Sequence, residues 1–302
     1  MSSLPRNQII LLVSGIFLLA LVVWFWLFLA TPISTPTVPE PEVPIVVVTP
    51  PVVVDPKTVI GTSVDGRAIE SYTFGTGSTT LLFVGGVHGG YEWNSVLVAY
   101  EMIDELTTGV MLLPAELSVV IIPALNPDGL FSVVGKEGRF TADEIPENTA
   151  HVTGQGRLNA HDVDLNRNFD CKWQPKSTWR SKTVNAGSAA FSEPEAEALR
   201  VVVTEIKPSA VVFWHSQAGA VYASECEAGI LPETLTLMEK YAAAGQYLAI
   251  TSFDAYPITG DAEGWLASLG IPAITVELET RESAEWSRNK AGITEVFTLY
   301  TK

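Results

Sequence analysis

The stretch at residues 81–94 reads LLFVGGVHGGYEWN: an apolar run, two glycines, and then His88 and Glu92 four residues apart. A buried strand that leads through a glycine-bearing turn into a helix brings side chains to the carboxyl end of the strand, where open α/β sheets bind their ligands. Imidazole and carboxylate are both zinc ligands, and a catalytic zinc takes three protein ligands and leaves one position for water. The stretch therefore predicts two ligands of a metal site, and the third must come from elsewhere in the chain.

Strands and helices alternate from residue 58 to the end of the chain. The hairpin signal Asp65-Gly66 lies between apolar segments at residues 60–63 and 68–74. Apolar runs predict buried strands at residues 79–84, 117–123, 210–214 and 273–278. Helical patterns predict helices at residues 93–106, 192–207, 231–248, 262–269 and 283–300. We predict an α/β fold, with a mixed, mainly parallel sheet and helices on both of its faces.

The middle of the chain is less regular. Asn126-Pro127-Asp128-Gly129 predicts a turn that ends the strand before it. Residues 130–190 then show no strong periodicity, and so long a stretch inside a compact domain is more often functional than idle.

The chain is acidic, with a net charge of −16 and a pI near 4.6. Only three of its 34 acidic residues and two of its 18 Lys/Arg residues precede residue 58, so the acidity belongs to the main domain. Nucleic acid is a poor partner for such a domain, because its affinity for proteins depends on basic side chains. The acidity is typical of a soluble surface, although attraction of cationic substrates is an alternative.

The N-terminal region contains 22 uncharged residues, 9–30, which predict one transmembrane helix. A cleaved signal peptide is the alternative, but its apolar core is usually about 7–15 residues long and ends at a small-x-small site. Arg6 precedes the apolar run and the next positive charge after it is Lys57. The positive-inside rule therefore predicts that residues 1–8 are cytoplasmic and that the rest of the chain lies outside the cytoplasm, at the cell membrane.

A stalk is expected at residues 31–57, where eight prolines alternate with Val, Thr, Ile and Glu. This composition is typical of an extended tether, with a reach on the order of 80 Å at about 3.1 Å per residue. Its valine triplets, at residues 46–48 and 52–54, offer the alternative of an edge strand. The catalytic domain is expected at residues 58–302.

A second histidine follows a predicted strand, since His215 and Ser216 come directly after residues 210–214. Together with His88 and Glu92, the motifs NPDG (126–129) and DLNRNF (164–169), and Glu277, it resembles in order and spacing the carboxypeptidase A family of zinc peptidases. The resemblance covers residues 58 to 302. One departure is that His88 and Glu92 have three intervening residues, where the family usually has two.

The resemblance implies that His88, Glu92 and His215 bind Zn²⁺. It also implies that Glu277 is the general base, which takes a proton from water and passes it to the leaving amine. Glu279 is the alternative, because alternation along a strand puts both glutamates on one face. Arg157 corresponds to the arginine that stabilises the oxyanion of the tetrahedral intermediate, with Arg139 as the alternative.

Further matches imply contacts to substrate. Asn166 and Arg167 resemble the pair that binds the terminal carboxylate, and Tyr256 resembles the mobile tyrosine that closes over substrate. Asp261 and Glu263 fall in the stretch that lines the specificity pocket, and a carboxylate there favours a basic group next to the scissile amide. The alternative is that Asp261 caps the helix at residues 262–269 and that Glu263 faces solvent in its first turn.

The two cysteines are expected to form a disulfide. Cys171 follows DLNRNF and Cys226 lies eleven residues after His215, so both segments pass the rim of the predicted site. Two cysteines in an extracytoplasmic domain are more often paired than free.

The predicted function is a membrane-anchored, extracytoplasmic zinc metallopeptidase that hydrolyses C-terminal peptide or amide bonds. Alternatives are an amidase of cell-wall stem peptides with the same fold, a deacylase of small amino acids, and an inactive binding protein. Either histidine alone is more typical of a buried core residue. Two histidines at strand ends, with a carboxylate and a general base, favour an enzyme.

Overall fold

The computed structural model describes residues 19–28, 56–146 and 154–301, and the chain divides into two compact units, Met1–Val52 and Val53–Lys302. In the first unit the described residues, 19–28, form a helix. No helix within the described part of the chain has both the length and the apolar character to cross a membrane. The expected membrane span, residues 9–30, continues beyond the described residues at both ends. The expected stalk also lies outside them, except Pro56 and Lys57, and Lys57 begins the first strand.

The second unit is built on an eight-stranded sheet in the order β1-β2-β4-β3-β7-β10-β8-β9. The central neighbours β4, β3, β7 and β10 are parallel. Strand β2 is antiparallel to β4 and β8 is antiparallel to β10, and at the edges β1 is antiparallel to β2 and β9 is parallel to β8. The strands are β1 (Lys57–Thr62), β2 (Ala68–Phe74), β3 (Thr79–Val84), β4 (Leu117–Ile122), β7 (Ala210–Ser216), β8 (Ala220–Ala223), β9 (Leu248–Ile250) and β10 (Ala273–Leu278). The predicted mixed, mainly parallel sheet is confirmed.

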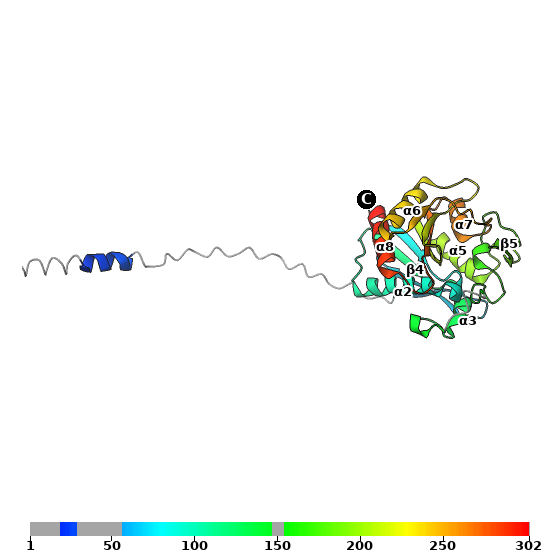
Figure 1. Cartoon of the computed structure of the whole chain (residues 1–302), viewed down its shortest axis with the longest axis horizontal. Helices are drawn as coiled ribbons and strands as arrows, with labels where there is room; N and C mark the ends of the chain where they lie inside the picture. Colours follow the sequence, from blue (N-terminus) through cyan, green and yellow to red (C-terminus); the bar gives the residue numbers. More distant parts are fainter. Residues whose placement is uncertain (1–18, 29–55, 147–153, 302) are drawn as a thin grey trace, which may run out of the picture. The chain divides into compact units, whose positions relative to one another are not determined.

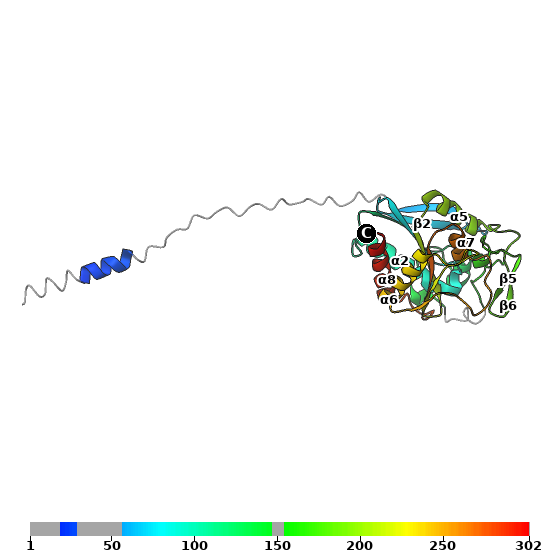
Figure 2. The same ribbon diagram turned by 90° about the horizontal axis from the view of Figure 1, so that it is seen from above.

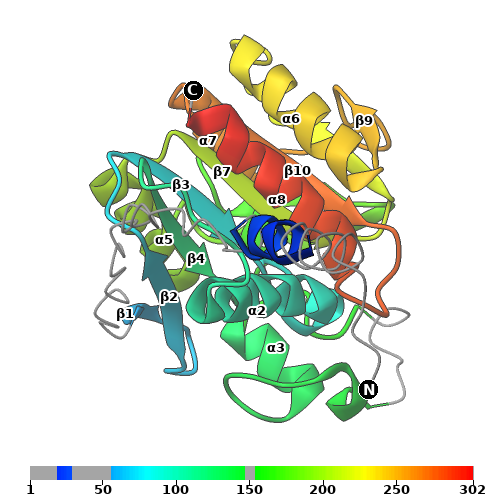
Figure 3. The ribbon, with the colours of Figure 1, turned by 90° about the vertical axis from the view of Figure 1, so that its left-hand side faces the viewer.

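Helices cover both faces of this sheet, as predicted. One face packs against α2 (Trp93–Thr108), α6 (Pro232–Gly245) and α8 (Trp286–Tyr300), the layer toward the viewer in Figure 3. The other face packs against α5 (Pro194–Ile206) and α7 (Ala262–Ser268). Strand β3 shows why: Leu81 and Phe83 join the first core, and Leu82 and Val84 join the second. A parallel strand that is covered on both faces has no solvent side and is therefore apolar throughout.

The region after β4 differs from the prediction. The NPDG turn is the start of a helix, α3 (Pro127–Val134), whose first turn is capped by Asn126 accepting a hydrogen bond from the Gly129 N–H at 2.8 Å. Proline in the first turn suits a helix start as well as a turn, so the motif alone did not decide between them. The irregular region also contains a hairpin, β5 (Lys176–Trp179) with β6 (Lys182–Asn185). Two views place this hairpin on the side of the unit away from the C-terminus (Figures 1 and 2).

Candidate metal centre and active site

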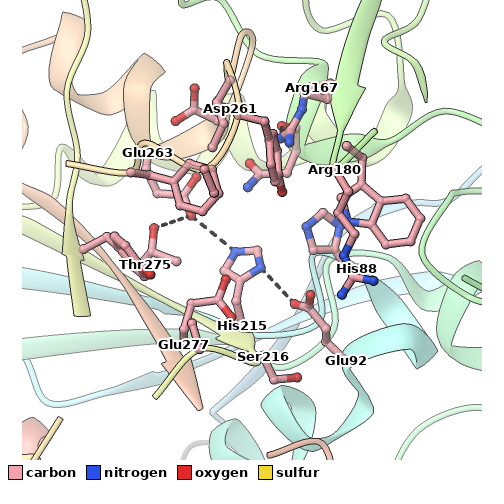
Figure 4. A pocket seen from close by; sticks show the side chains of 18 of the residues that line it. His88, Glu92, Arg167, Arg180, His215, Ser216, Asp261, Glu263, Thr275 and Glu277 are labelled. Atoms are coloured by element: carbon pink, nitrogen blue, oxygen red, sulfur yellow. Dashed lines mark hydrogen bonds and ion pairs between the residues drawn. The ribbon is translucent and has the colours of Figure 1, made fainter. Parts of the chain in front are cut away.

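Three side chains converge at the carboxyl ends of the central strands. His88 follows β3, Glu92 ends a short 3-10 helix, η1 (Gly89–Glu92), and His215 is the last residue but one of β7. All three are buried, and one ligand atom from each lies within 4.8 Å of the others. Figure 4 shows the two imidazoles and the carboxylate facing a common space. The structure therefore brings together the three residues that the sequence predicts as metal ligands.

The longer spacing between His88 and Glu92 is accommodated by the 3-10 turn. Gly89 has φ +46°, and a Cβ built on it would lie 2.7 Å from the Gly156 carbonyl oxygen. Gly90 is equally confined, because its Cβ would lie 2.5 Å from Val133. The two glycines let the turn pack closely against α3, and the turn still aims Glu92 at His215, with 2.9 Å between Oε2 and Nδ1.

The buried nitrogen and oxygen atoms around the site are suited to a bound metal ion. In the part of the chain that the structure describes, Nδ1 of His88 and Oδ1 of Asp164 have no hydrogen-bond partner, and they lie 3.6 Å apart. Asp164 is fully buried, and its other oxygen accepts from Arg157 Nε at 2.9 Å. A carboxylate behind a liganding histidine is a common outer partner that orients the ring. Two histidines and one glutamate are also a donor set of catalytic zinc.

The negative charge around His215 also favours a cation. Its Nδ1 lies 2.9 Å from Glu92 Oε2 and its Nε2 lies 3.3 Å from Glu263 Oε1. Burial lowers the pKa of His215, but the two carboxylates outweigh burial and hold this pKa well above its ordinary value. By contrast, burial holds the pKa of His88 well below its ordinary value, and the positive charge of Arg157 acts in the same direction. His88 is therefore neutral, and the carboxylates of Glu92 and Glu263 favour a positive charge at His215.

Glu277 lies on β10 beside His215 on β7, in register across the two parallel strands. Its side chain lines the cavity, and burial, followed by the negative charge of Glu92, raises its pKa to about 7. Glu279 lies beyond the end of the strand, has a side chain that is 68% exposed, and pairs with Arg288 at 2.8 Å. The geometry therefore favours Glu277 over Glu279 as the general base.

A cavity of about 900 Å³ opens over these residues. Arg157 lines it, is buried, and lies 2.9 Å from Asp164 Oδ2 and 3.9 Å from Glu92 Oε1. Arg139 is half exposed and pairs instead with Asp104 at 2.8 Å. The geometry therefore favours Arg157 over Arg139 as the cation beside the metal ligands.

Asn166, Arg167 and Tyr256 line the same cavity. Asn166 Oδ1 accepts from the Ala262 N–H at 2.9 Å, and Arg167 Nε donates to the Thr178 carbonyl at 3.1 Å. Arg167 is buried and makes no ion pair within residues 56–146 and 154–301. A buried guanidinium without a carboxylate partner is suited to bind one from a ligand. Tyr256 is half buried, in the segment between β9 and α7.

The alternative that Asp261 caps α7 is confirmed, because its Oδ2 accepts from the Gly264 N–H at 2.7 Å. Burial, and then the charge of Glu263, raise the pKa of Asp261 to about 6. The alternative that Glu263 faces solvent is wrong. Its side chain is buried, lines the cavity, and accepts from Thr275 Oγ1 at 3.0 Å, because the first turn of α7 packs directly onto β10.

A family comparison agrees with this geometry. A model of the zinc carboxypeptidase family matches residues 51–300, most of the chain. The chain belongs to the zinc carboxypeptidase family. Its cofactor is therefore Zn²⁺, for which His88, Glu92 and His215 form a suitable site.

Two kinds of relative are similar to this member of the zinc carboxypeptidase family. Murein peptide amidase A of Escherichia coli is 30% identical over 141 residues, which cover 43% of this chain and 54% of the relative, so the chain spans about half the length of that relative. Among solved structures, murein-tripeptide amidase of Escherichia coli has a TM-score of 0.56 at 23% identity, over 80% of this chain and 91% of that one. Carboxypeptidase A of Helicoverpa armigera has a TM-score of 0.58 at 19% identity, over 82% and 69%. These two structural similarities show that the fold is shared.

The expected disulfide between Cys171 and Cys226 is present. The Cys171 carbonyl accepts from the Gly260 N–H at 2.7 Å, and the Gly260 carbonyl accepts from the Phe169 N–H at 2.8 Å. The segment after Arg167 is therefore tied to the segment before α7 by hydrogen bonds and to the segment after β8 by the disulfide.

Sequence reasoning missed three residues beside the metal ligands. Asp164 belongs to the DLNRNF motif, and its position seven residues after Arg157 was the available signal. Tyr91 and Arg281 line the cavity, and the Arg281 guanidinium carbon lies 4.2 Å from the centroid of the Tyr91 ring. Their only sequence signal is proximity, since Tyr91 precedes Glu92 and Arg281 follows Glu277 by four residues.

Proposed function

We propose that this member of the zinc carboxypeptidase family hydrolyses the amide bond of a C-terminal residue in cell-wall stem peptides. The observation that carries the proposal is the assembly of His88, Glu92 and His215 with Glu277 in one cavity. Bound zinc supplies a Lewis acid and lowers the pKa of a coordinated water toward 7. Side chains carry out the proton transfers, stabilise the oxyanion and bind the substrate.

Glu277 takes the proton of the attacking water and passes it to the leaving amine, a task suited to a pKa near neutrality. Arg157, held by Asp164, donates to the oxyanion that forms at the scissile carbonyl. Arg167 and Asn166 bind the terminal carboxylate of the substrate. Tyr256 closes over the leaving residue.

Stem peptides are favoured over ordinary peptides by two observations. The first is the 30% identity with murein peptide amidase A. The second is Glu263, a buried carboxylate in the cavity wall. Burial opposes its ionisation, but His215 outweighs burial and the pKa of Glu263 is lowered, so the carboxylate stays charged. Such a group favours a leaving residue with a basic end, either Lys/Arg or the amine of a diaminopimelate-like residue.

A mixed pool of ordinary peptides and muropeptides, digested with zinc present and read by mass spectrometry, tests this function. We expect loss of one C-terminal residue, mainly from muropeptides that end in a diamino acid. Cleavage of ordinary peptides alone would favour a general carboxypeptidase, and no cleavage by zinc-loaded protein would favour the inactive binding protein.

Glu263→Gln tests the side-chain preference, with Asp261→Asn as the comparison. We expect Glu263→Gln to lose the preference for Lys over Leu in kcat/KM. Asp261→Asn is expected to keep the preference, because Asp261 caps α7. Zinc content is measured in both variants, because Glu263 also contacts His215. Equal kcat/KM for Lys and Leu in the wild type would end the proposal of a basic preference.

We also propose that the enzyme is held at the cell membrane, with residues 9–30 as the anchor and residues 31–57 as the stalk. The 22 uncharged residues and the position of Arg6 before them support this arrangement. In fractionated cells, the full chain should stay with membranes through an alkaline wash, and residues 56–302 alone should not. Protease added outside the cytoplasmic membrane should reach the catalytic domain, and protection of that domain would contradict the orientation.

A further inference from the structure

The cavity contains more unpaired positive charge than the proposed reaction uses. Arg157 is paired with Asp164, and Arg167 is assigned to the terminal carboxylate of the substrate. Arg281 also lines the cavity, yet within residues 56–146 and 154–301 it makes no ion pair, although the chain carries a net charge of −16. With so many carboxylates available in the protein, a guanidinium left without one is suited to a ligand.

Arg281 is fixed in place by two contacts. Its Nη2 donates to the Ser216 carbonyl at 3.0 Å, and its guanidinium carbon lies 4.2 Å from the centroid of the Tyr91 ring. Its Nε is buried and has no hydrogen-bond partner among the described residues. A guanidinium has five N–H donors in a planar fork, so these contacts orient the group and leave donors for a carboxylate.

These contacts place Arg281 beside the metal ligands. Ser216 directly follows His215, and Tyr91 directly precedes Glu92. Arg167 is held elsewhere, by the carbonyl of Thr178 on the β5–β6 hairpin. In Figure 4, Arg167 lies toward the top of the view and Ser216 toward the bottom, with His215 between them. The guanidinium groups of Arg167 and Arg281 therefore lie on two sides of the metal centre.

A substrate whose scissile amide lies at the metal has its leaving residue on one side and its acyl residue on the other. With the terminal carboxylate at Arg167, the acyl residue extends toward Arg281. We propose that Arg281, with Tyr91 beneath it, forms a second anion subsite that binds a carboxylate of the acyl residue. This inference rests on the proposed function and adds a specificity residue to it.

Two linkages would present such a carboxylate. One is a glutamyl residue joined through its side chain, which keeps its α-carboxylate free near the scissile amide. The other is an ordinary α-linked Asp or Glu, whose carboxylate is on the side chain. Both supply the same chemistry to the guanidinium fork, and substrates of the two kinds distinguish them.

The test compares kcat/KM on four dipeptides that end in the same diamino acid: γ-linked Glu, α-linked Glu, and the neutral amide of each. We expect the wild type to favour one acidic substrate over its amide by about tenfold or more, as for a charge-assisted hydrogen bond. Arg281→Gln should remove that preference and change kcat/KM on the amides by less than about threefold. Arg200→Gln is the matched control, because Arg200 is exposed on α5 and pairs with Glu197.

Equal loss on acidic and neutral substrates in Arg281→Gln, or no preference in the wild type, would overturn the subsite. A binding measurement distinguishes failure of the subsite from failure of the proposed function. Glutarate, with two carboxylates, and butyrate, with one, are titrated by calorimetry into zinc-loaded wild type and Arg281→Gln. Tighter binding of glutarate that is lost in Arg281→Gln supports the subsite even if no dipeptide is cleaved. The same glutarate-to-butyrate ratio in both proteins contradicts it.

Discussion

Glu277 combines the two properties that a general base needs: a place in the cavity beside the metal ligands and a pKa raised to about 7. Glu277→Gln keeps the shape of the side chain and removes the proton acceptor. We expect kcat to fall by about 10²–10⁴-fold, with zinc content unchanged. The matched control is Glu279→Gln, which is expected to stay near wild-type activity because Glu279 is exposed and paired with Arg288. Comparable losses in both variants would contradict the assignment.

The same residue predicts the acid limb of the pH profile. Burial and Glu92 raise the pKa of Glu277 to about 7, so the carboxylate, which is the form that accepts a proton, is lost as the pH falls through this pKa. The positive charge of bound zinc favours the carboxylate and moves the midpoint lower. We therefore expect kcat/KM to decrease below a midpoint at or under pH 7, as a stopped assay from pH 4.5 to 8 would measure. A profile that is flat down to pH 4.5 would exclude Glu277 as the base.

At the scale of residues, the sequence predicted the groups that strands carry to their ends. His88, His215 and Glu277 follow or end apolar runs, and the sheet order brings those strand ends together. The contact of Glu263 with His215 was not predictable in this way. It depends on how α7 packs against β10, a long-range arrangement that no local pattern contains.

At the scale of elements, the predicted strands and helices with strong patterns are present with small shifts of their ends. Residues 117–123 became β4 (Leu117–Ile122), and residues 283–300 became α8 (Trp286–Tyr300). Short elements were missed: α3, the β5–β6 hairpin, β8 and β9. Strands of three or four residues are held by their neighbours rather than by their own pattern, so periodicity does not reveal them.

The disulfide is the covalent link between two of these irregular segments, since Cys171 follows the motif that contains Arg167 and Cys226 follows β8. Its sequence separation is 55 residues, and removing a disulfide of this kind costs about 2–5 kcal/mol of stability. We expect the double variant Cys171→Ser/Cys226→Ser to unfold at a lower temperature and to have a higher KM, because the Arg167 segment loses its covalent attachment. Thermal unfolding and steady-state kinetics measure both effects.

Thiol labelling of the unreduced, unfolded wild type provides the control and should detect no free thiol. Two free thiols would contradict the bond. A double variant with unchanged KM would show that the hydrogen bonds through Gly260 are enough to hold the segment.

At the scale of the whole molecule, the metal centre joins the two halves of the sheet. His88 follows β3 and Glu92 precedes α2, whereas His215 comes from β7, so one ion cross-links segments 123 residues apart in sequence. An ion that binds only the folded state stabilises it by mass action, by about 2.7 kcal/mol when free zinc is 100-fold above Kd. For a domain of this size that corresponds to a rise in Tm of about 5–10 °C.

We therefore expect chelation to lower the Tm of the wild type and added zinc to restore it, with about one zinc bound per chain by metal analysis. His88→Ala and His215→Ala should lose zinc, activity and the zinc-dependent rise in Tm together, because each removes one of three proposed protein ligands. His161→Ala is the matched control. Its side chain is 57% exposed and pairs with Glu193 away from the cavity, so this variant should keep all three properties. Full zinc occupancy in His215→Ala would exclude His215 as a ligand, and an unchanged Tm on chelation of the wild type would show that zinc does not link the two segments.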